Sequence, residues 1–350
     1  GQRGNFLSIP MDCPQRDERL GWTGDTQIFS RTAMYNADVY GFYRQWMRDM
    51  RNGQNAATGA FRDIAPYCLF WGEGNAAWGD AGVIVPWVAY DMTGDKTILE
   101  ENYEAMKAWM RFCAGQADST WQYNGAGTSF GDWLSYEDYV KRYVSVTHYA
   151  YVAKLMQKAA LALSADAADA YARDAAAYGE LYENIRQEFQ RRYLNADGSL
   201  NVGTQTSYLL ALHLGLLPEE CVETAKEILR KKIVDNGYKL STGFVGTGIL
   251  TTTLSEVGCD DLAYDLLLQR KNPSWLYSVD QGATTIWERW NSYTKKDGFG
   301  AAGMNSFNHY AYGAVLAWMY GTMAGIQEDV ACPGFKHVIL APVPDRRMGK

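Results

Sequence analysis

The stretch YARDAAAYGELYENIRQEFQRRY, residues 171–193, decides the fold class of this chain. Its apolar side chains recur every three or four residues, and Glu, Arg and Gln fill the positions between them. That spacing places the apolar groups along one side of an α-helix. The segment therefore predicts a long helix that buries one face against a neighbour.

The same periodicity continues outward in both directions. Further helices are expected over residues 35–50, 99–113, 149–163, 206–214, 219–236, 247–257, 260–269 and 310–322. Glycines at positions 53, 94, 115, 215, 237 and 258 follow such segments, where a left-handed residue commonly ends a helix. A strand-like pattern appears only in the tail, FKHVILAPVPDRR at 335–347. We expect an all-α body of antiparallel helix pairs in a closed ring or a solenoid, with a β-like segment after it. A ring would gather the loops of one end around a central funnel.

The composition narrows the class of protein. The 350 residues contain no linker or charge run that would divide them, so one large domain is expected. A net charge of −7, with acids and bases interspersed, argues against a nucleic-acid partner. No apolar stretch approaches the roughly 20 residues that span a bilayer, so no membrane partner is expected. Because the first motif begins at Asp12, we expect a piece of a longer protein, whose compartment is left open.

Metal and acyl-transfer chemistry are not indicated. The six cysteines form no CxxC, and the four histidines form no HExxH, so we expect no metal and no cofactor. There is no GxSxG motif for a serine nucleophile. An acid/base pair of carboxyl groups is the remaining chemistry.

The first candidate for that pair lies in MDCPQRDERLGWTGD, residues 11–25. Asp12, Asp17, Glu18 and Asp25 crowd together beside Trp22. Such crowding raises at least one carboxyl pKa, as a general acid requires. The alternative is a solvated acidic loop in which an Asp caps the following helix.

The second candidate lies in DQGATTIWERWNSY, residues 280–293. Glu288 stands between Trp287 and Trp290. A carboxylate among large apolar rings is costly unless the site uses it. The alternative is a surface residue paired with Arg289.

Three further side chains could contact a sugar. His309, in NSFNHY, could donate to a sugar hydroxyl, or it could be a satisfied structural histidine. Trp78 in WGD and Trp133 in GDW each place an indole beside an acid, which suits stacking and hydroxyl recognition but also suits a core.

These motifs resemble the catalytic domain of glycoside hydrolase family 78, the bacterial α-L-rhamnosidases. The matching stretches cover nearly the whole chain, and they include DCPQRDERLGWTGD (12–25), LSTGFVGT (240–247), PSWLYSVDQGATTIWERW (273–290) and MNSFNHYAYG (304–313). The resemblance implies an (α/α)6 barrel that removes terminal L-rhamnose with inversion. By motif position it implies Glu18 as general acid and Glu288 as general base.

The resemblance also implies sugar-binding residues and a domain division. Asp12, Asp25, Trp22 and His309 match positions that hold the sugar, and Trp78 and Trp133 match pocket walls. Residues 1–330 would form the barrel, and 331–350 would begin a truncated C-terminal β-sandwich. Family members usually carry β-rich domains around the barrel, and this chain would lack most of them.

Two other readings stay open. One is a different helical-toroid hydrolase acting on glycans, and the other is a catalytically silent glycan-binding toroid. An inverting pair of carboxyl groups should lie roughly 6.5–9.5 Å apart, whereas a retaining pair lies at about 5–5.5 Å. The aglycone, the linkage and the oligomeric state are not encoded in these motifs.

Overall fold

The computed structural model describes residues 1–68, 72–122, 129–164 and 170–348. The helices of this part are α1 (Gln2–Asn5), α2 (Thr23–Asn36), α3 (Tyr40–Gly53), α4 (Ala81–Thr93), α5 (Thr97–Gln116), α6 (Lys141–Ser164), α7 (Ala170–Tyr193), α8 (Gln205–His213), α9 (Glu219–Asp235), α10 (Phe244–Glu256), α11 (Asp260–Leu268), α12 (Trp275–Asp280) and α13 (Val315–Trp318). The strands are β1 (Tyr293–Thr294), β2 (Gly298–Phe299), β3 (Ile326–Glu328) and β4 (Val338–Leu340).

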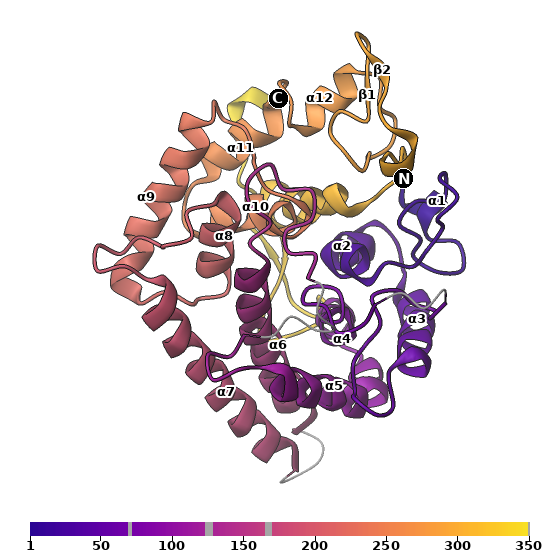
Figure 1. Cartoon of the computed structure of the whole chain (residues 1–350), viewed down its shortest axis with the longest axis vertical. Coiled ribbons are helices and arrows are strands. Elements are labelled where there is room, and N and C mark those ends of the chain that lie inside the picture. The colour runs from indigo at the N-terminus through magenta and orange to yellow at the C-terminus, as the bar shows by residue number, and fades with distance from the viewer. Residues whose placement is uncertain (69–71, 123–128, 165–169, 349–350) are drawn as a thin grey trace.

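The helices form a double-walled ring. Helices α2, α4, α6, α8, α10 and the helical segment 311–323 contact one another in succession, and this segment closes the ring against α2. Helices α3, α5, α7, α9 and α11 pack outside them, each against an inner neighbour (Figure 1). Each inner helix is followed by an outer one that runs back, so the inner helices share one direction. This confirms the predicted barrel of antiparallel pairs.

The predicted apolar stripes lie where a two-walled ring needs them. In α7, the side chains of Tyr182, Ile185 and Phe189 are buried against α6, and the intervening polar residues face outward. Inner helices are covered on both sides, which is why α6 is buried over most of its length. Gly94 ends α4 with a φ of 70°, as predicted. Gly53 instead lies within the last turn of α3, so that predicted boundary was wrong.

The closing segment departs from the single helix predicted over 310–322. It runs as a 3₁₀ turn (Ala311–Ala314), α13 and a π-helical turn (Met319–Met323) in succession. The physical reason lies in α2. The Thr32 hydroxyl donates to the Ala314 carbonyl at 3.0 Å and accepts from the Ala317 N–H at 3.1 Å. A side chain inserted between these backbone groups breaks the regular hydrogen-bond ladder.

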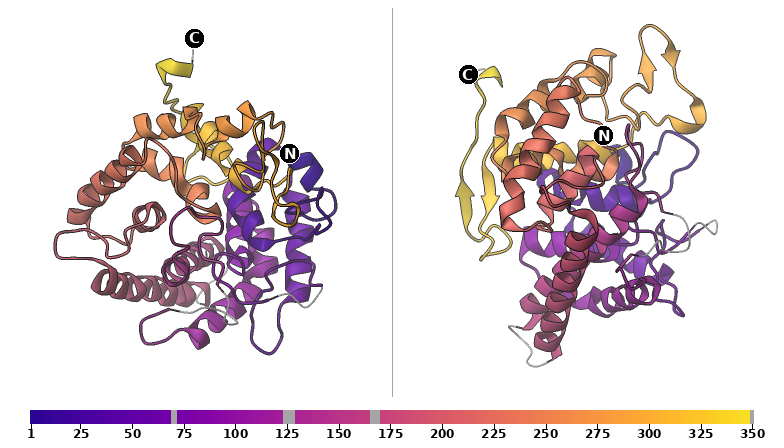
Figure 2. Two further views of the ribbon diagram at one scale, coloured as in Figure 1. Left: turned by 45° about the horizontal axis from the view of Figure 1, so that its top comes forward. Right: turned by 60° about the vertical axis from the view of Figure 1, so that its left-hand side comes forward.

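Two short hairpins lie at opposite ends of the ring. β1 pairs with β2, and β3 pairs with β4, both antiparallel (Figure 2). The second hairpin confirms the strand-like tail but begins five residues before 331, at Ile326. It thus crosses the predicted division at 330, which stays a prediction. None of the helices formed by the described residues has the length and apolarity that crossing a membrane requires.

Candidate active site

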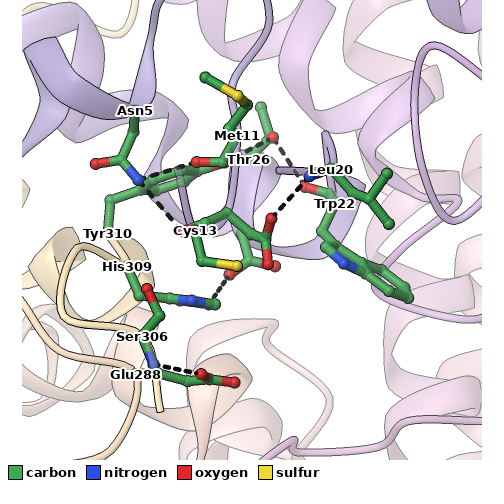
Figure 3. A network of polar contacts seen from close by, with 12 residues as sticks. Asn5, Met11, Cys13, Leu20, Trp22, Thr26, Glu288, Ser306, His309 and Tyr310 are labelled. Atoms are coloured by element: carbon green, nitrogen blue, oxygen red, sulfur yellow. Dashed lines mark hydrogen bonds and ion pairs between the residues drawn. The ribbon is translucent and has the colours of Figure 1, made fainter. Parts of the chain in front are cut away.

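The two acidic segments meet at one end of the ring, near the N-terminal ends of the inner helices. Residues 12–22 lead into α2, and residues 304–310 lead into the closing segment that packs on α2. Glu288 joins them because its backbone N–H donates to the Ser306 carbonyl at 2.9 Å and its carboxylate accepts from the Ser306 N–H (Figure 3). Closure of the ring therefore brings together carboxyl groups that are far apart in sequence.

Arg16 lies between the two predicted catalytic glutamates. Its Nη1 donates to Glu288 Oε2 at 2.7 Å, and its Nη2 makes a short contact with Glu18 Oε2. The same Nη2 lies 3.9 Å from Asp12 Oδ2. One guanidinium thus neutralises part of a cluster that would otherwise repel itself. The sequence reading missed this role, and its signal was the one Arg inside DCPQRDE.

Glu288 is 3% exposed and is held by residues of two other segments. Its Oε2 accepts from the Ser306 N–H at 2.9 Å in addition to Arg16. The alternative of a surface pair with Arg289 is therefore wrong. The flanking indoles point into the protein, since Trp290 stacks on Tyr312 with ring centroids 4.2 Å apart.

Glu18 is more accessible, with 26% of its side chain exposed. The Trp22 indole N–H donates to Glu18 Oε1 at 2.6 Å, and the Cys13 thiol lies 3.8 Å from Oε2. An exposed carboxyl group held at its edge by an indole can still turn toward a ligand. Trp22 itself precedes α2 and provides no side-chain cap, so the alternative of a simple capping loop does not describe this helix start.

Asp25 and His309 form a buried pair beneath these groups. His309 Nε2 lies 2.7 Å from Asp25 Oδ1, and Asp25 is in the first turn of α2. Burial alone would lower the pKa of His309, but Asp25, Glu288 and Asp12 outweigh it and raise the value to about 9. The ring is thus an imidazolium at neutral pH. Its Nδ1 is buried and has no hydrogen-bond partner within the described ranges.

Asp12 is the crowded carboxyl group whose pKa the structure raises. Burial, opposed by His309 and reinforced by Asp25 and Glu18, brings it to about 6. Its Oδ1 accepts from the Leu20 N–H at 3.2 Å, which fixes the turn between the two halves of the motif. Asp12 can therefore exchange a proton within the neutral range.

A metal is a poor fit to the same cluster. Asp12, Cys13 and His309 each offer a ligand atom within 4.8 Å of the others. Burial and the adjacent Asp12 raise the pKa of the Cys13 thiol, whereas metal binding needs the thiolate. His309 carries a proton on both nitrogens when charged and then has no lone pair to give. The cluster is better suited to donating and accepting hydrogen bonds.

The remaining predicted aromatics lie at one side of the site. Trp22 and Trp133 contact the Phe130 ring edge-on, at 5.8 Å and 6.1 Å between centroids. Trp78 lies behind Phe130 at 4.6 Å and is only 3% exposed. Trp133 is half-buried, so it presents more surface than Trp78. Both remain predicted pocket walls, and Phe130 is an aromatic that the motifs did not single out.

The acids beside those indoles have structural roles. Asp80 accepts from the Trp109 indole N–H at 3.0 Å and from the Ala77 N–H at 2.6 Å. Asp132 accepts from the N–H groups of Gly243 at 2.8 Å and Gly246 at 3.0 Å, which orders the start of α10. Asp80 and Asp132, the acids of these two motifs, thus stabilise the framework of the barrel through hydrogen bonds.

Comparisons with known proteins place this geometry in a family. A family model described as the bacterial alpha-L-rhamnosidase 6 hairpin glycosidase domain matches residues 1–323. A protein of Formosa agariphila named alpha-L-rhamnosidase is 43% identical over 98% of this chain and 37% of its own length. One of Streptomyces avermitilis with the same name is 41% identical over 98% of this chain and 32% of its own. The chain thus spans about a third of the curated relatives it matches.

Solved structures agree with the fold. The crystal structure of the Streptomyces avermitilis alpha-L-rhamnosidase complexed with L-rhamnose superposes with a TM-score of 0.90 at 41% identity, over 98% of this chain and 32% of that one. That of native alfa-L-rhamnosidase from Aspergillus terreus gives 0.88 at 35% identity, over 98% of this chain and 40% of that one.

Proposed function

Because this chain belongs to the family of bacterial α-L-rhamnosidases with a six-hairpin glycosidase domain, we propose that it hydrolyses terminal non-reducing α-L-rhamnosides with inversion. The observation that carries the proposal is that Glu18 and Glu288 contact the two terminal nitrogens of the Arg16 guanidinium. This contact lies at the end of the ring where the inner helices begin, which we call the funnel end. The L-rhamnose complex of the Streptomyces avermitilis relative supports the choice of sugar.

Glu18 is the proposed general acid. It is the more exposed of the two carboxyl groups, so it can reach the glycosidic oxygen as that bond breaks. Trp22 holds Oε1 and leaves Oε2, the oxygen that faces Arg16, to carry the proton.

Glu288 is the proposed general base. It is buried and receives two donors, the Ser306 N–H and Arg16, both of which stabilise its ionised form. An ionised carboxylate on the face opposite Glu18 can accept a proton from water as that water attacks the anomeric carbon.

Arg16 cannot keep its contacts with both glutamates if Glu18 is to hold a proton when substrate binds. A guanidinium favours the ionised form of any carboxylate it contacts, and a general acid has to hold a proton. We therefore propose that the bound sugar separates Arg16 from Glu18 and leaves it on Glu288. Arg16 would act as a positioning residue that assigns one carboxyl group to each role.

The sugar-holding groups follow from the same geometry. Asp12 and the Asp25–His309 pair are buried polar groups at the floor of the site, suited to the hydroxyls of the ring. Trp22, with Trp78 and Trp133 behind and beside Phe130, would form the apolar wall. A rhamnose has a methyl group for that wall and hydroxyls for the floor.

The division into domains is also a proposal. Residues 1–330 would act as the catalytic barrel and 331–350 as the start of a β-rich domain of a longer protein. Two features support it: the relatives are about three times as long, and β4 exposes Val338, Ile339 and Leu340.

The decisive assay measures release from aryl α-L-rhamnoside and from matched aryl glycosides of other sugars, with the anomer of the product followed by proton NMR. We expect rhamnoside-specific release with the β-anomer formed first. Release of another sugar would favour a different toroid hydrolase, and first appearance of the α-anomer would exclude inversion. Binding of rhamnose without release, by an intact fold, would favour a silent glycan-binding toroid.

A further inference from the structure

A second chamber lies at the end of the ring opposite the candidate active site. It has a volume of about 550 Å³, within the range of small-molecule sites. Its mouth is lined by side chains near the C-terminal ends of the inner helices, among them Asp91, Lys158, His213 and Glu256, and by Glu328 of β3. Among the described residues, none of those assigned to catalysis or sugar binding above lines it.

Two buried polar side chains reach this chamber without a complete set of partners. Gln27 is 8% exposed, and its side-chain amide makes no hydrogen bond to any residue the structure describes. His148 is 4% exposed, and its Nδ1 lies 3.2 Å from Asp80 Oδ2. That Nδ1 is buried and makes no hydrogen bond within the described ranges, so the Asp80 contact is an ion-pair distance only. Buried amides and imidazoles are normally satisfied, so both side chains can take a further polar partner.

The acids at the mouth of the chamber already have basic partners. Arg31 is paired with Asp91 and, at 2.9 Å, with Glu328. His213 Nδ1 lies 2.8 Å from Glu256. The acids at the mouth are therefore occupied.

Lys154 and Lys158 differ from the other charged groups at the mouth. Neither forms an ion pair with any described residue, and each ammonium instead lies over a ring, that of Tyr182 at 5.0 Å and that of Trp87 at 5.5 Å. Burial, and then the like charge of Lys158, lower the pKa of Lys154. Two unpaired cations one helical turn apart form a receptor for an anionic group.

His148, Lys154 and Lys158 all lie on α6, whereas Gln27 is on α2. His148, Tyr151, Leu155 and Lys158 step by three, four and three residues, which places them on a single face. From His148 to Lys154 the helix rises about 9 Å, which is the length of a one- or two-unit sugar. Trp87 and Tyr151 add ring surface beside this strip.

We propose that this chamber binds a small acidic sugar, with its carboxylate at Lys154 and Lys158 and its hydroxyls at Gln27 and His148. A bare inorganic anion would use the lysines alone. A neutral sugar would leave both ammonium groups unmatched. The proposal concerns a site separate from the one assigned to rhamnoside hydrolysis and does not depend on it.

Isothermal titration of the chain with D-glucuronate and D-galacturonate tests the proposal, with D-glucose, L-rhamnose and sulfate as comparison ligands. We expect at least one uronate to bind more tightly than glucose and sulfate by about tenfold, because loss of a charge-assisted contact or of the hydroxyl contacts each costs that much. Lys154→Met and Lys158→Met should each raise the Kd of that uronate by about tenfold, and Gln27→Leu should raise it less.

Matched control variants test whether the uronate binds in the chamber and not elsewhere on the protein. Lys231→Met, at an exposed position on α9, should leave the Kd unchanged, and so should Glu288→Gln in the candidate active site. Circular dichroism of each variant establishes that it folds. Equal binding of sulfate, retention of uronate affinity in both folded lysine variants, or absence of uronate binding would each overturn the proposal.

Discussion

Two buried aspartate–histidine pairs of the barrel lie in different surroundings. At the funnel end His309 contacts Asp25 at 2.7 Å, and in the wall of the opposite chamber His148 contacts Asp80 at 3.2 Å. The first pair sits among carboxyl groups that outnumber Arg16, whereas the chamber has two lysines with no described acidic partner.

The direction of the inner helices explains part of this difference. Asp25 lies in the first turn of α2, where free N–H groups favour negative charge, and His213 ends α8, where free carbonyls favour positive charge. A ring in which every inner helix runs the same way has one end suited to acids and another suited to bases. The comparison teaches that helix direction favours the proposed acid/base pair at the first end and the proposed anion site at the second.

The largest expected effect comes from removing either carboxylate of the funnel end. Glu288→Gln should lower kcat on aryl α-L-rhamnoside by about 10²–10⁴-fold, because a general base is lost. Glu18→Gln should lower kcat by a similar factor on a rhamnoside with a poor leaving group. The loss should be smaller on a rhamnoside with a good leaving group, which needs little protonation. Glu183→Gln, on exposed α7 surface, is the matched control. Unchanged turnover in either active-site variant would remove that residue from the mechanism.

A smaller effect is expected from Arg16, the guanidinium that contacts both glutamates. Arg16→Met should lower kcat/KM by about 10–100-fold, because a charge-assisted contact to Glu288 is lost. The pH–rate profile should also change, because the charge that contacts both carboxyl groups is lost. Arg19→Met, more than half exposed beside Arg16, should behave as the native chain. A native pH profile in Arg16→Met would contradict the positioning role.

The third expectation concerns the His309–Asp25 pair and its pH dependence. The pKa of His309 is raised from 6.5 to about 9 in the fold, so its protonation stabilises the native state fully below pH 6.5. That contribution, on the order of 2–3 kcal/mol, is lost as the pH rises through 9. Asp25→Asn should lower the pKa of His309 in NMR titration and flatten this part of the stability profile. An unchanged titration of His309 in Asp25→Asn would contradict the pairing.

The smallest effect is expected at the mouth of the opposite chamber. Burial, and a proton shared with Asp91, raise the pKa of Glu328, so its ionisation costs stability as the pH rises through that raised value. Glu328→Gln imitates the protonated form and should remove this loss, changing the free energy of unfolding by about 1 kcal/mol or less. Thermal unfolding between pH 5 and 8 measures it. Rhamnoside turnover should not change, and a large loss of turnover would mean that the two ends are coupled.

Local pattern predicted the barrel better than it predicted its contacts. The apolar stripe of α7 could be predicted from local sequence, because burial of Ile185 and Phe189 follows from their spacing alone. The closing segment could not be predicted as an irregular helix, since its cause is a hydroxyl on Thr32, nearly 300 residues away in sequence. Periodicity reports which face a helix buries and says nothing of what lies opposite.

The same limit applies to the candidate site. The sequence motifs singled out Glu18, Glu288 and His309, and the three side chains lie close together in the structure. The role of Arg16 was missed because a charge count treats it as a neutralising neighbour and cannot show that it touches two segments. Asp80 and Asp132 looked like ligand contacts beside their indoles, but backbone N–H groups hold them.

The contact that closes the ring also sets the order in which this protein can mature. Glu18 and Glu288 meet only after the last helical segment docks on α2, so their encounter closes a loop of about 270 residues, which costs entropy that early local helices do not. Helical hairpins can form while the chain is still incomplete, but the proposed acid/base pair cannot. The rate at which turnover recovers during refolding therefore measures the final docking step. The rate at which the helical circular dichroism signal recovers measures the earlier formation of hairpins.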